Sequence, residues 1–245
     1  MNLLHAILLG IVEGITEFLP VSSTGHLNIV EKLLGYQIDS PGMTAFTAVI
    51  QVGAIIAAIV FFWKDIVAIV VAWCRGIVHA DKRDDPNYRM GWAVILGSIP
   101  VAVVGLAFKN AIETTTRSLW VIVGALLVWS IVMAIADRRD HGERTMVDVT
   151  WKDGLIIGLF QALAPVFPGI SRSGATISAG LFRGMDRVSA TKLSFFLGIP
   201  ALVAAGGMEA ISQAGAISAQ VGWLPTAVAT VVSLVVAYVS IAWLL

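Results

Sequence analysis

Two apolar segments of this chain follow the same pattern, and each is interrupted by proline. Residues 10–26 align with residues 158–174 at a shift of 148 places, which puts Pro20 on Pro168. Between them the segments contain two carboxylates, an arginine, a histidine and six hydroxyls. A repeated apolar unit that breaks at proline predicts paired discontinuous helices near the middle of a bilayer. Ionisable groups at that depth indicate a functional site, because burying them is costly.

The composition indicates a membrane protein. Of the 245 residues, 58% are hydrophobic and 13% are charged, and the mean hydropathy is +0.87. The 16 basic residues balance the 16 acidic ones, so no basic surface for nucleic acid is expected. Cys74 is the single cysteine, which excludes an internal disulfide. We predict one integral membrane domain over residues 1–245, whose acidic first segment is not a cleaved signal peptide.

Hydropathy along the chain predicts the spanning helices. Five uninterrupted apolar stretches have about the ~20 residues that a span requires, namely 45–63, 92–108, 118–136, 193–211 and 223–245. Segments 3–34 and 153–182 are broken and predict re-entrant helical hairpins. Broken backbone persists at membrane depth only inside protein or beside a water-filled cavity, so the two hairpins are expected to face each other. The predicted fold is an all-α, polytopic helical bundle.

The distribution of basic residues predicts the orientation. Eleven of the 16 lie in 75–89, 137–152 and 183–192, whereas the loops near 109–117 and 212–222 carry two. The positive-inside rule places the first three in the cytoplasm. Hairpin 3–34 then enters from the outer side and hairpin 153–182 from the cytoplasmic side. This predicts inverted repeats over about 1–75 and 153–245, linked by a helical hairpin at 91–136.

Glu13 and Glu17 form the acidic part of the first broken segment. Four residues apart on a helix, they project from one face, and two desolvated carboxylates repel unless a cation or a shared proton lies between them. The spacing therefore favours a hard divalent cation. The alternative is a structural pair that shares a proton and accepts hydrogen bonds from serine and threonine.

The residues after each break are suited to an anion. Ser22 or Ser23 is a suitable N-cap for the second half of one hairpin, and Ser171 for the other. Helix N-termini attract anions, and a forked arginine such as Arg172 matches phosphate oxygens. Further hydroxyl donors are Ser171, Ser173 and Thr176. A structural alternative is that Arg172 only neutralises Glu13 or Glu17.

His26 is the histidine with a reactive context. It follows Ser22, Ser23 and Thr24 within one turn, so an imidazole and a hydroxyl can act together on a phosphorus atom. Gln51, within a predicted span, is a candidate substrate donor, or it simply bridges helices.

These motifs, from Glu13 to His26 and from Pro168 to Thr176, closely resemble those of the undecaprenyl pyrophosphate phosphatases, also called bacitracin-resistance proteins. The resemblance covers nearly the whole chain. It implies a multi-pass enzyme of the bacterial inner membrane that hydrolyses undecaprenyl pyrophosphate to undecaprenyl phosphate and inorganic phosphate. This recycles the lipid carrier for peptidoglycan synthesis, and bacitracin competes for the substrate. It also implies Mg²⁺ or Ca²⁺, an active site open to the periplasmic side, and a homodimer.

The resemblance and the residue chemistry together assign expected roles. The metal ligands are Glu13 and Glu17; the catalytic residues are Glu17, Ser22, Ser23, His26 and Arg172; the substrate-binding residues are Thr24, Ser171, Arg172, Ser173, Thr176 and Gln51. We favour a hydroxyl of Ser22 or Ser23 as the nucleophile, with Glu17 or His26 as its base, while a phosphohistidine and direct attack by water stay open. The alternative function is a transporter or flippase of phosphate-bearing prenyl lipids, which would not need hydroxyls and histidine beside paired glutamates.

Overall fold

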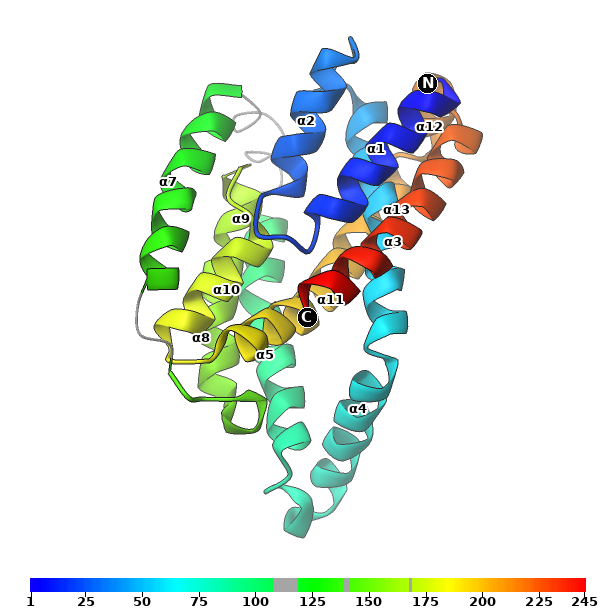
Figure 1. Ribbon diagram of the computed structural model, residues 1–245. Coiled ribbons are helices and arrows are strands. Elements are labelled where there is room, and N and C mark those ends of the chain that lie inside the picture. The colour runs from blue at the N-terminus through cyan, green and yellow to red at the C-terminus, as the bar shows by residue number, and fades with distance from the viewer. Residues whose placement is uncertain (108–118, 139–141, 168) are drawn as a thin grey trace. The chain divides into compact units, whose positions relative to one another are not determined.

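The computed structural model describes residues 1–107, 119–138, 142–167 and 169–245, and all helices and turns named below belong to that part (Figure 1). Every regular element there is a helix, which confirms the predicted all-α class. The chain forms two compact units: unit one is Met1–Phe61 with Ile199–Leu245, and unit two is Phe62–Gly198. Each unit is described by itself, and the expected meeting of the hairpins stays a prediction. The predicted loop 109–117 and Pro168 lie outside the described residues.

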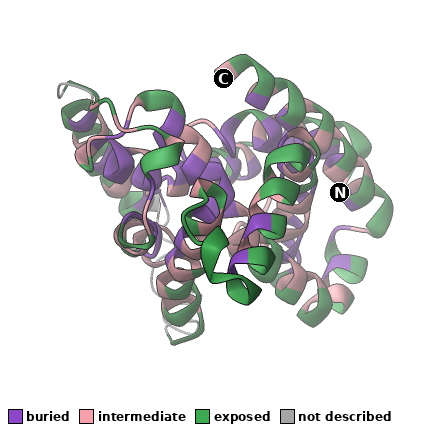
Figure 2. Ribbon diagram, turned by 90° about the horizontal axis from the view of Figure 1, so that it is seen from below, coloured by how far each residue is buried: buried purple, intermediate pink, exposed green. Residues whose placement is uncertain are grey.

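Five helices are long and apolar enough to cross a membrane, as the hydropathy predicted. They are α3 (Pro41–Phe61), α5 (Pro86–Ala107), α7 (Leu119–Arg138), α11 (Arg187–Ser212) and α13 (Trp223–Leu244). Large hydrophobic side chains such as Leu127 and Ile131 are exposed along these helices. Figure 2 shows helices with buried residues on one face and exposed residues on the other. In a chain this apolar, such exposed faces are suited to contact with lipid.

Both segments predicted to be broken contain more than one helix. In unit one, α1 (Leu3–Thr16) and α2 (Ser23–Leu33) are separated by a turn that contains Pro20. In unit two, the second segment divides into three helices, α8 (Trp151–Gln161), α9 (Leu163–Val166) and α10 (Arg172–Phe182). The breaks at Pro20 and Gly169 are confirmed, whereas the break expected at Pro165 is wrong, because Pro165 lies inside α9 and the chain instead breaks at Ala162.

Unit one is held together by close helix packing around α13. A methyl group added to Gly10 of α1 would lie 2.5 Å from the carbonyl oxygen of Ala229, and one added to Gly53 of α3 would meet the carbonyl of Thr230. Glycine at these positions lets backbones approach as they do in other membrane bundles. A buried cluster lies beside this contact, formed by Ala6, Leu9, Leu27, Met43, Phe46, Ile50, Val221 and Ala229.

Unit two uses the same device between α8 and α5. Methyl groups added to Gly154 and Gly158 would meet the backbones of Ala93 and Gly97, respectively. Gly158 is the residue that aligns with Gly10 in the sequence repeat. The first helix of each hairpin is thus attached to a spanning helix through glycine.

One helix of unit two was not predicted. α4 (Trp63–Val78) is amphipathic and only 16 residues long, so it does not have the uniform hydropathy of a span. Asp65 in its first turn and Arg75 in its last turn complement the helix dipole. Arg75, which we expected in a basic loop, therefore lies in the last turn of a helix.

A buried carboxylate joins the beginning of α8 to the end of α10. Asp153 accepts hydrogen bonds from Arg144 Nη2 at 2.7 Å, from Arg183 Nε at 3.0 Å and from Thr150 Oγ1 at 2.7 Å. Burial alone would raise the pKa of the Asp153 carboxyl, but these hydrogen bonds together lower it well below its usual range. The cluster fixes the base of the second hairpin.

Candidate active site

The two predicted carboxylates lie at the end of α1, next to the break in unit one. Glu13 is fully buried and Glu17 is 5% exposed. The N–H of Glu17 donates to the carbonyl of Glu13, so the two residues are one helical turn apart. The predicted shared face is therefore confirmed, and both side chains belong to the buried interior of the protein.

A short side-chain hydrogen bond joins Glu17 to the next helix. Ser23 Oγ donates a hydrogen bond to Glu17 Oε2 at 2.6 Å, and both residues are buried. A hydroxyl that donates to a buried carboxylate has the geometry of a nucleophile and its general base. Of the two serines that the sequence left open, Ser23 is the one in this geometry.

Ser22 has a different role, because it is the N-cap of α2. Its Oγ accepts from the N–H of Gly25 at 3.2 Å. Its backbone has φ = 70° and ψ = 95°, on the positive-φ side that non-glycine residues rarely adopt. Strain of this kind persists only where the surrounding structure enforces it, and it is concentrated at functional sites.

His26 lies one turn into α2 and is exposed. Its Nδ1 is 2.8 Å from the carbonyl oxygen of Ser22. Since a carbonyl only accepts, Nδ1 carries the proton, and Nε2 is left as the acceptor of the neutral ring. The imidazole is therefore oriented by the strained residue and can take up a proton at Nε2. Thr24, half-buried, lies between Ser23 and His26 on the same turn.

In unit two, the break is followed by a capped helix N-terminus. Ser171 Oγ accepts from the N–H of Gly174 at 3.0 Å and lies 3.0 Å from Ser173 Oγ. Gly169 has φ = 114°, and a side chain there would also meet the carbonyl oxygen of Ile122. Only glycine suits this turn, which directs the chain into α10.

Arg172 and Thr176 are positioned by α11. Arg172 Nη1 donates to the carbonyl oxygen of Ser194 at 3.3 Å, and Thr176 Oγ1 donates to Ser194 Oγ at 2.6 Å. A methyl group on Gly198 would collide with the Arg172 guanidinium, so glycine provides the space for this side chain. The predicted group is therefore together at the beginning of α10, with Ser171 as the N-cap, Arg172 and Ser173 in the first turn and Thr176 at the fifth helical position.

Gln51 differs from the other predicted residues. It lies half-buried on α3, and no hydrogen bond joins its amide to the other residues that the structure describes. Its predicted role as a donor to the substrate stays a prediction.

Two residues were missed as site candidates. Ser194 contacts Arg172 and Thr176 from another helix, and no local pattern in the sequence reveals it. Gln161, at the end of α8, is fully buried, and its amide oxygen and nitrogen have no hydrogen-bond partner among the described residues. The repeat provided a signal for Gln161, since this residue aligns with Glu13.

The carboxylates of unit one fit one type of metal site. Within the described part of the chain, no three His, Cys, Asp or Glu side chains form a cluster. A protein cage for Ca²⁺ is thus not built from such side chains there. Mg²⁺, in contrast, is commonly bound by one or two carboxylates together with substrate phosphates and water. Glu13 and Glu17 are the two carboxylates that would contribute to such a donor set.

Comparison with known proteins identifies the family of this chain. Residues 6–245 match the family described as bacitracin resistance protein BacA. The chain is 68% identical to the undecaprenyl-diphosphatase of Cutibacterium acnes, covering all of this chain and 88% of that protein. It is 59% identical to undecaprenyl-diphosphatase 3 of Frankia casuarinae and 51% identical to the undecaprenyl-diphosphatase of Acidothermus cellulolyticus, again over all of this chain and 88% of each relative. This chain, with its Glu17–Ser23 hydrogen bond and with Arg172 directly after the N-cap Ser171, is a member of the BacA family.

Proposed function

We propose that this protein hydrolyses undecaprenyl pyrophosphate to undecaprenyl phosphate and inorganic phosphate. One water molecule is consumed. The bond that is cleaved joins the terminal phosphorus atom to the bridging oxygen. The structural observation that carries the proposal is the 2.6 Å hydrogen bond from Ser23 to Glu17. A carrier of the same lipid has no use for such a pair, and the flippase alternative is not favoured.

Unit one supplies the proton-transfer chemistry. We propose that Ser23 Oγ attacks the terminal phosphorus while Glu17 accepts the hydroxyl proton. The bond from that phosphorus to the bridging oxygen breaks, and undecaprenyl phosphate leaves with the bridging oxygen, so that a phosphoserine remains. The His26 imidazole, with its free acceptor at Nε2, would receive a proton from water in the second step, when the phosphoseryl bond is hydrolysed. Ser22 keeps both groups in place as the cap of α2, and Thr24 provides a further hydroxyl on the same turn.

Unit two supplies phosphate recognition. The N-terminus of α10 and the guanidinium of Arg172 provide positive potential, and the hydroxyls of Ser171 and Ser173 are the proposed further donors. The Thr176 hydroxyl donates to Ser194 Oγ in the protein alone, so it would have to turn toward the substrate to act as a third donor. These groups stabilise charge that develops on phosphoryl oxygens in the transition state. Gln51 remains a candidate donor from α3.

A divalent cation is part of the proposal. Glu13 and Glu17 would hold Mg²⁺, or Ca²⁺ if substrate oxygens and water supply most of its ligands. When bound, the cation neutralises charge on the pyrophosphate and offsets the repulsion between the two carboxylates.

We propose the membrane arrangement that the sequence indicates. The breaks in 3–34 and 153–182 support re-entrant hairpins, and the basic loops support inverted repeats with the reaction centre open to the periplasmic side of the inner membrane. The pyrophosphate headgroup would bind among the polar groups of the protein, and the prenyl tail would lie in lipid beside exposed apolar helix faces. We further propose a homodimer, and competition with bacitracin for the pyrophosphate.

Phosphate release from a C15 or C55 prenyl pyrophosphate tests the function directly. Purified protein in detergent is assayed with and without EDTA, as the native chain and as Glu17→Ala and Arg172→Ala. Glu143→Ala and Arg75→Ala are the matched controls, since both residues are exposed. We expect EDTA to abolish phosphate release by the native chain. Glu17→Ala and Arg172→Ala should lose release while they remain folded, and the two control variants should keep it. No release by folded native protein supplied with lipid would refute the proposal and favour transport, measured in liposomes.

A further inference from the structure

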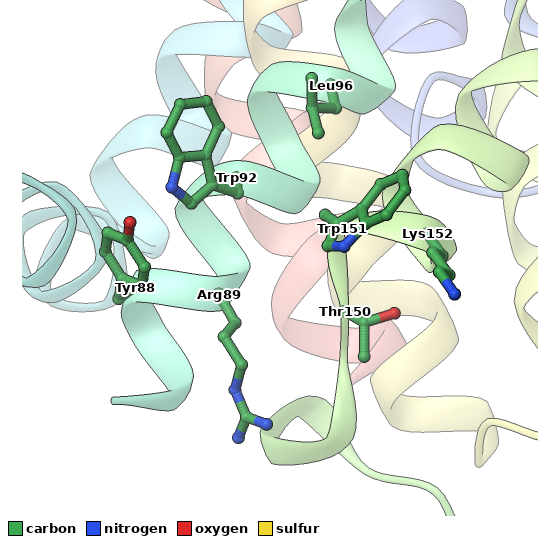
Figure 3. Close-up of a pocket in the computed structure, with 7 residues that line it drawn as sticks. All are labelled: Tyr88, Arg89, Trp92, Leu96, Thr150, Trp151 and Lys152. Atoms are coloured by element: carbon green, nitrogen blue, oxygen red, sulfur yellow. The ribbon is translucent and has the colours of Figure 1, made fainter. Parts of the chain in front are cut away.

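A groove of about 650 Å³ lies between α5 and the start of α8 in unit two (Figure 3). Tyr88, Trp92 and Leu96 line it from successive turns of α5, and Trp151 lines it from α8. The groove is at the opposite end of α8 from the hairpin break, and α8 has 11 residues, so about 15 Å of helix separates the two. It is therefore a distinct site from the one described above.

The walls of this groove are preformed. Gly97 and Gly154 bring the backbones of α5 and α8 into contact, as described above, which fixes the distance between the two sides. Trp92 also packs edge-on against Trp73 of α4, with ring centroids 5.7 Å apart. Aromatic and aliphatic side chains held in this way present an apolar surface that does not need to reorganise on binding.

Two cations line the groove from its two sides, Arg89 from α5 and Lys152 from α8 (Figure 3). Arg89 Nη2 donates to the carbonyl oxygen of Val147 at 3.1 Å, and Lys152 Nζ is 5.7 Å from the ring centroid of Trp151. Among the described residues, neither cation forms an ion pair. The neighbouring carboxylate of Asp153 is neutralised by Arg144 and Arg183, so it does not compensate Lys152.

The groove therefore changes from charged to apolar along its length. Arg89 and Leu96 are seven residues apart on α5, which corresponds to about 10 Å along the helix. Basic residues, tryptophan and tyrosine are the groups that occupy the boundary between headgroups and acyl chains. Arg89 and Lys152 lie near the beginning of α5 and α8, at the ends of the basic segments 75–89 and 137–152 that we predict to lie in the cytoplasm by the positive-inside rule.

We propose that this groove binds an anionic phospholipid of the cytoplasmic leaflet. The headgroup phosphate lies between Arg89 and Lys152, and the first part of an acyl chain lies against Trp92 and Leu96. A soluble anion would leave the apolar wall uncovered, and a neutral lipid would leave two cations uncompensated. Charge complementarity together with the apolar wall thus selects the anionic lipid.

Native mass spectrometry of the full-length protein in detergent tests the proposal, with phosphatidylglycerol and phosphatidylcholine as probes. The double variant Arg89→Gln/Lys152→Gln should weaken phosphatidylglycerol binding about tenfold or more, since each basic residue near anionic lipid contributes to affinity. Leu96→Trp should also reduce binding, by filling the apolar end without a change in charge. Arg75→Gln/Lys82→Gln is the matched control, because both residues are exposed, basic and outside the groove.

Equal loss in the control pair would overturn the proposal, because binding would then depend on overall charge. Equal binding of the two lipids by the native protein would overturn the headgroup assignment, and unchanged binding by Leu96→Trp would overturn the location. The thermal midpoint of each variant without added lipid, expected within about 4 °C of the native protein, shows that the variants are folded. Since this readout counts lipids, it is independent of phosphatase activity.

Discussion

Replacing Asp153 by asparagine should destabilise the second hairpin while leaving its reactive end unchanged. The carboxylate is fully buried and accepts hydrogen bonds from two guanidiniums, Arg144 and Arg183. Asparagine retains the size of the side chain but removes its charge, so both arginines lose their ion-pair partner. The beginning of α8 is then no longer tied to the end of α10.

The size of the effect follows from the exposure of the partners. Breaking a buried ion pair costs about 3–5 kcal/mol, and we expect about 3 kcal/mol here. The low end applies because the Arg144 and Arg183 side chains are 33% and 38% exposed and keep part of their solvation. For a chain of this size, about 3 kcal/mol corresponds to a decrease of about 6–12 °C in Tm.

Thermal unfolding in detergent measures this decrease, with Asp137→Asn as the matched control. The Asp137–Arg187 pair has both side chains 60% exposed, so its loss should cost no more than about 1 kcal/mol. The lowered pKa of Asp153 means that its stabilisation is present above pH 3.8, the ordinary value, and is lost only as pH falls through the lower value in the folded state. The Tm difference should therefore be constant between pH 7 and pH 5. A decrease no larger than that of the control, or a difference that shrinks at pH 5, would refute this reasoning.

Three further predictions concern the two hairpins. Ser23→Ala should lower kcat by about 10²–10⁴-fold, because it removes the hydroxyl that donates to Glu17. Ser22→Ala should mainly lower Tm, because it removes the N-cap of α2. Steady-state kinetics and thermal unfolding distinguish the two effects, and equal losses of kcat would contradict the assignment. Gln161→Met should raise the Tm, since a buried amide without partners costs about 1–3 kcal/mol; a lower Tm would indicate a bound partner in the protein. Gly158→Ala should lower the Tm by steric conflict with α5, whereas Gly105→Ala on the same helix pair, where nothing lies within 4 Å, should raise it slightly; equal shifts would rule out close packing as the reason.

The spanning helices and the helix breaks were predictable because they depend on local patterns. A stretch of apolar residues near the length of a span predicts α3 or α13 without knowledge of its neighbours, and proline predicts the break after Thr16. The serine after the second break also predicted an N-cap, and Ser171 caps α10. α4 was not predicted, because an amphipathic helix of this length lacks the hydropathy signal of a span.

What could not be predicted depends on contacts between residues far apart in the chain. Ser194 orients Arg172 and Thr176 across 22 and 18 positions, and Arg144 reaches Asp153 from a loop. The choice of Ser23 over Ser22 as the partner of Glu17 required the direction of each hydroxyl, which depends on the backbone of the turn. Sequence patterns specify residue types on an element but not the orientation of a side chain at its end.

The positive φ of Ser22 has a consequence for the mutational tolerance of the two neighbouring serines. At position 22, glycine and asparagine accept this backbone readily, whereas valine and isoleucine do not. Position 23 begins α2, so there the backbone tolerates most residues and only the hydroxyl is selected. When every residue is tested at both positions, the variants at position 22 that still fold should be those whose side chains accept a positive φ. The variants at position 23 that still support growth should be those that keep a hydroxyl. Two adjacent residues of the same type would thus be retained under different selective constraints.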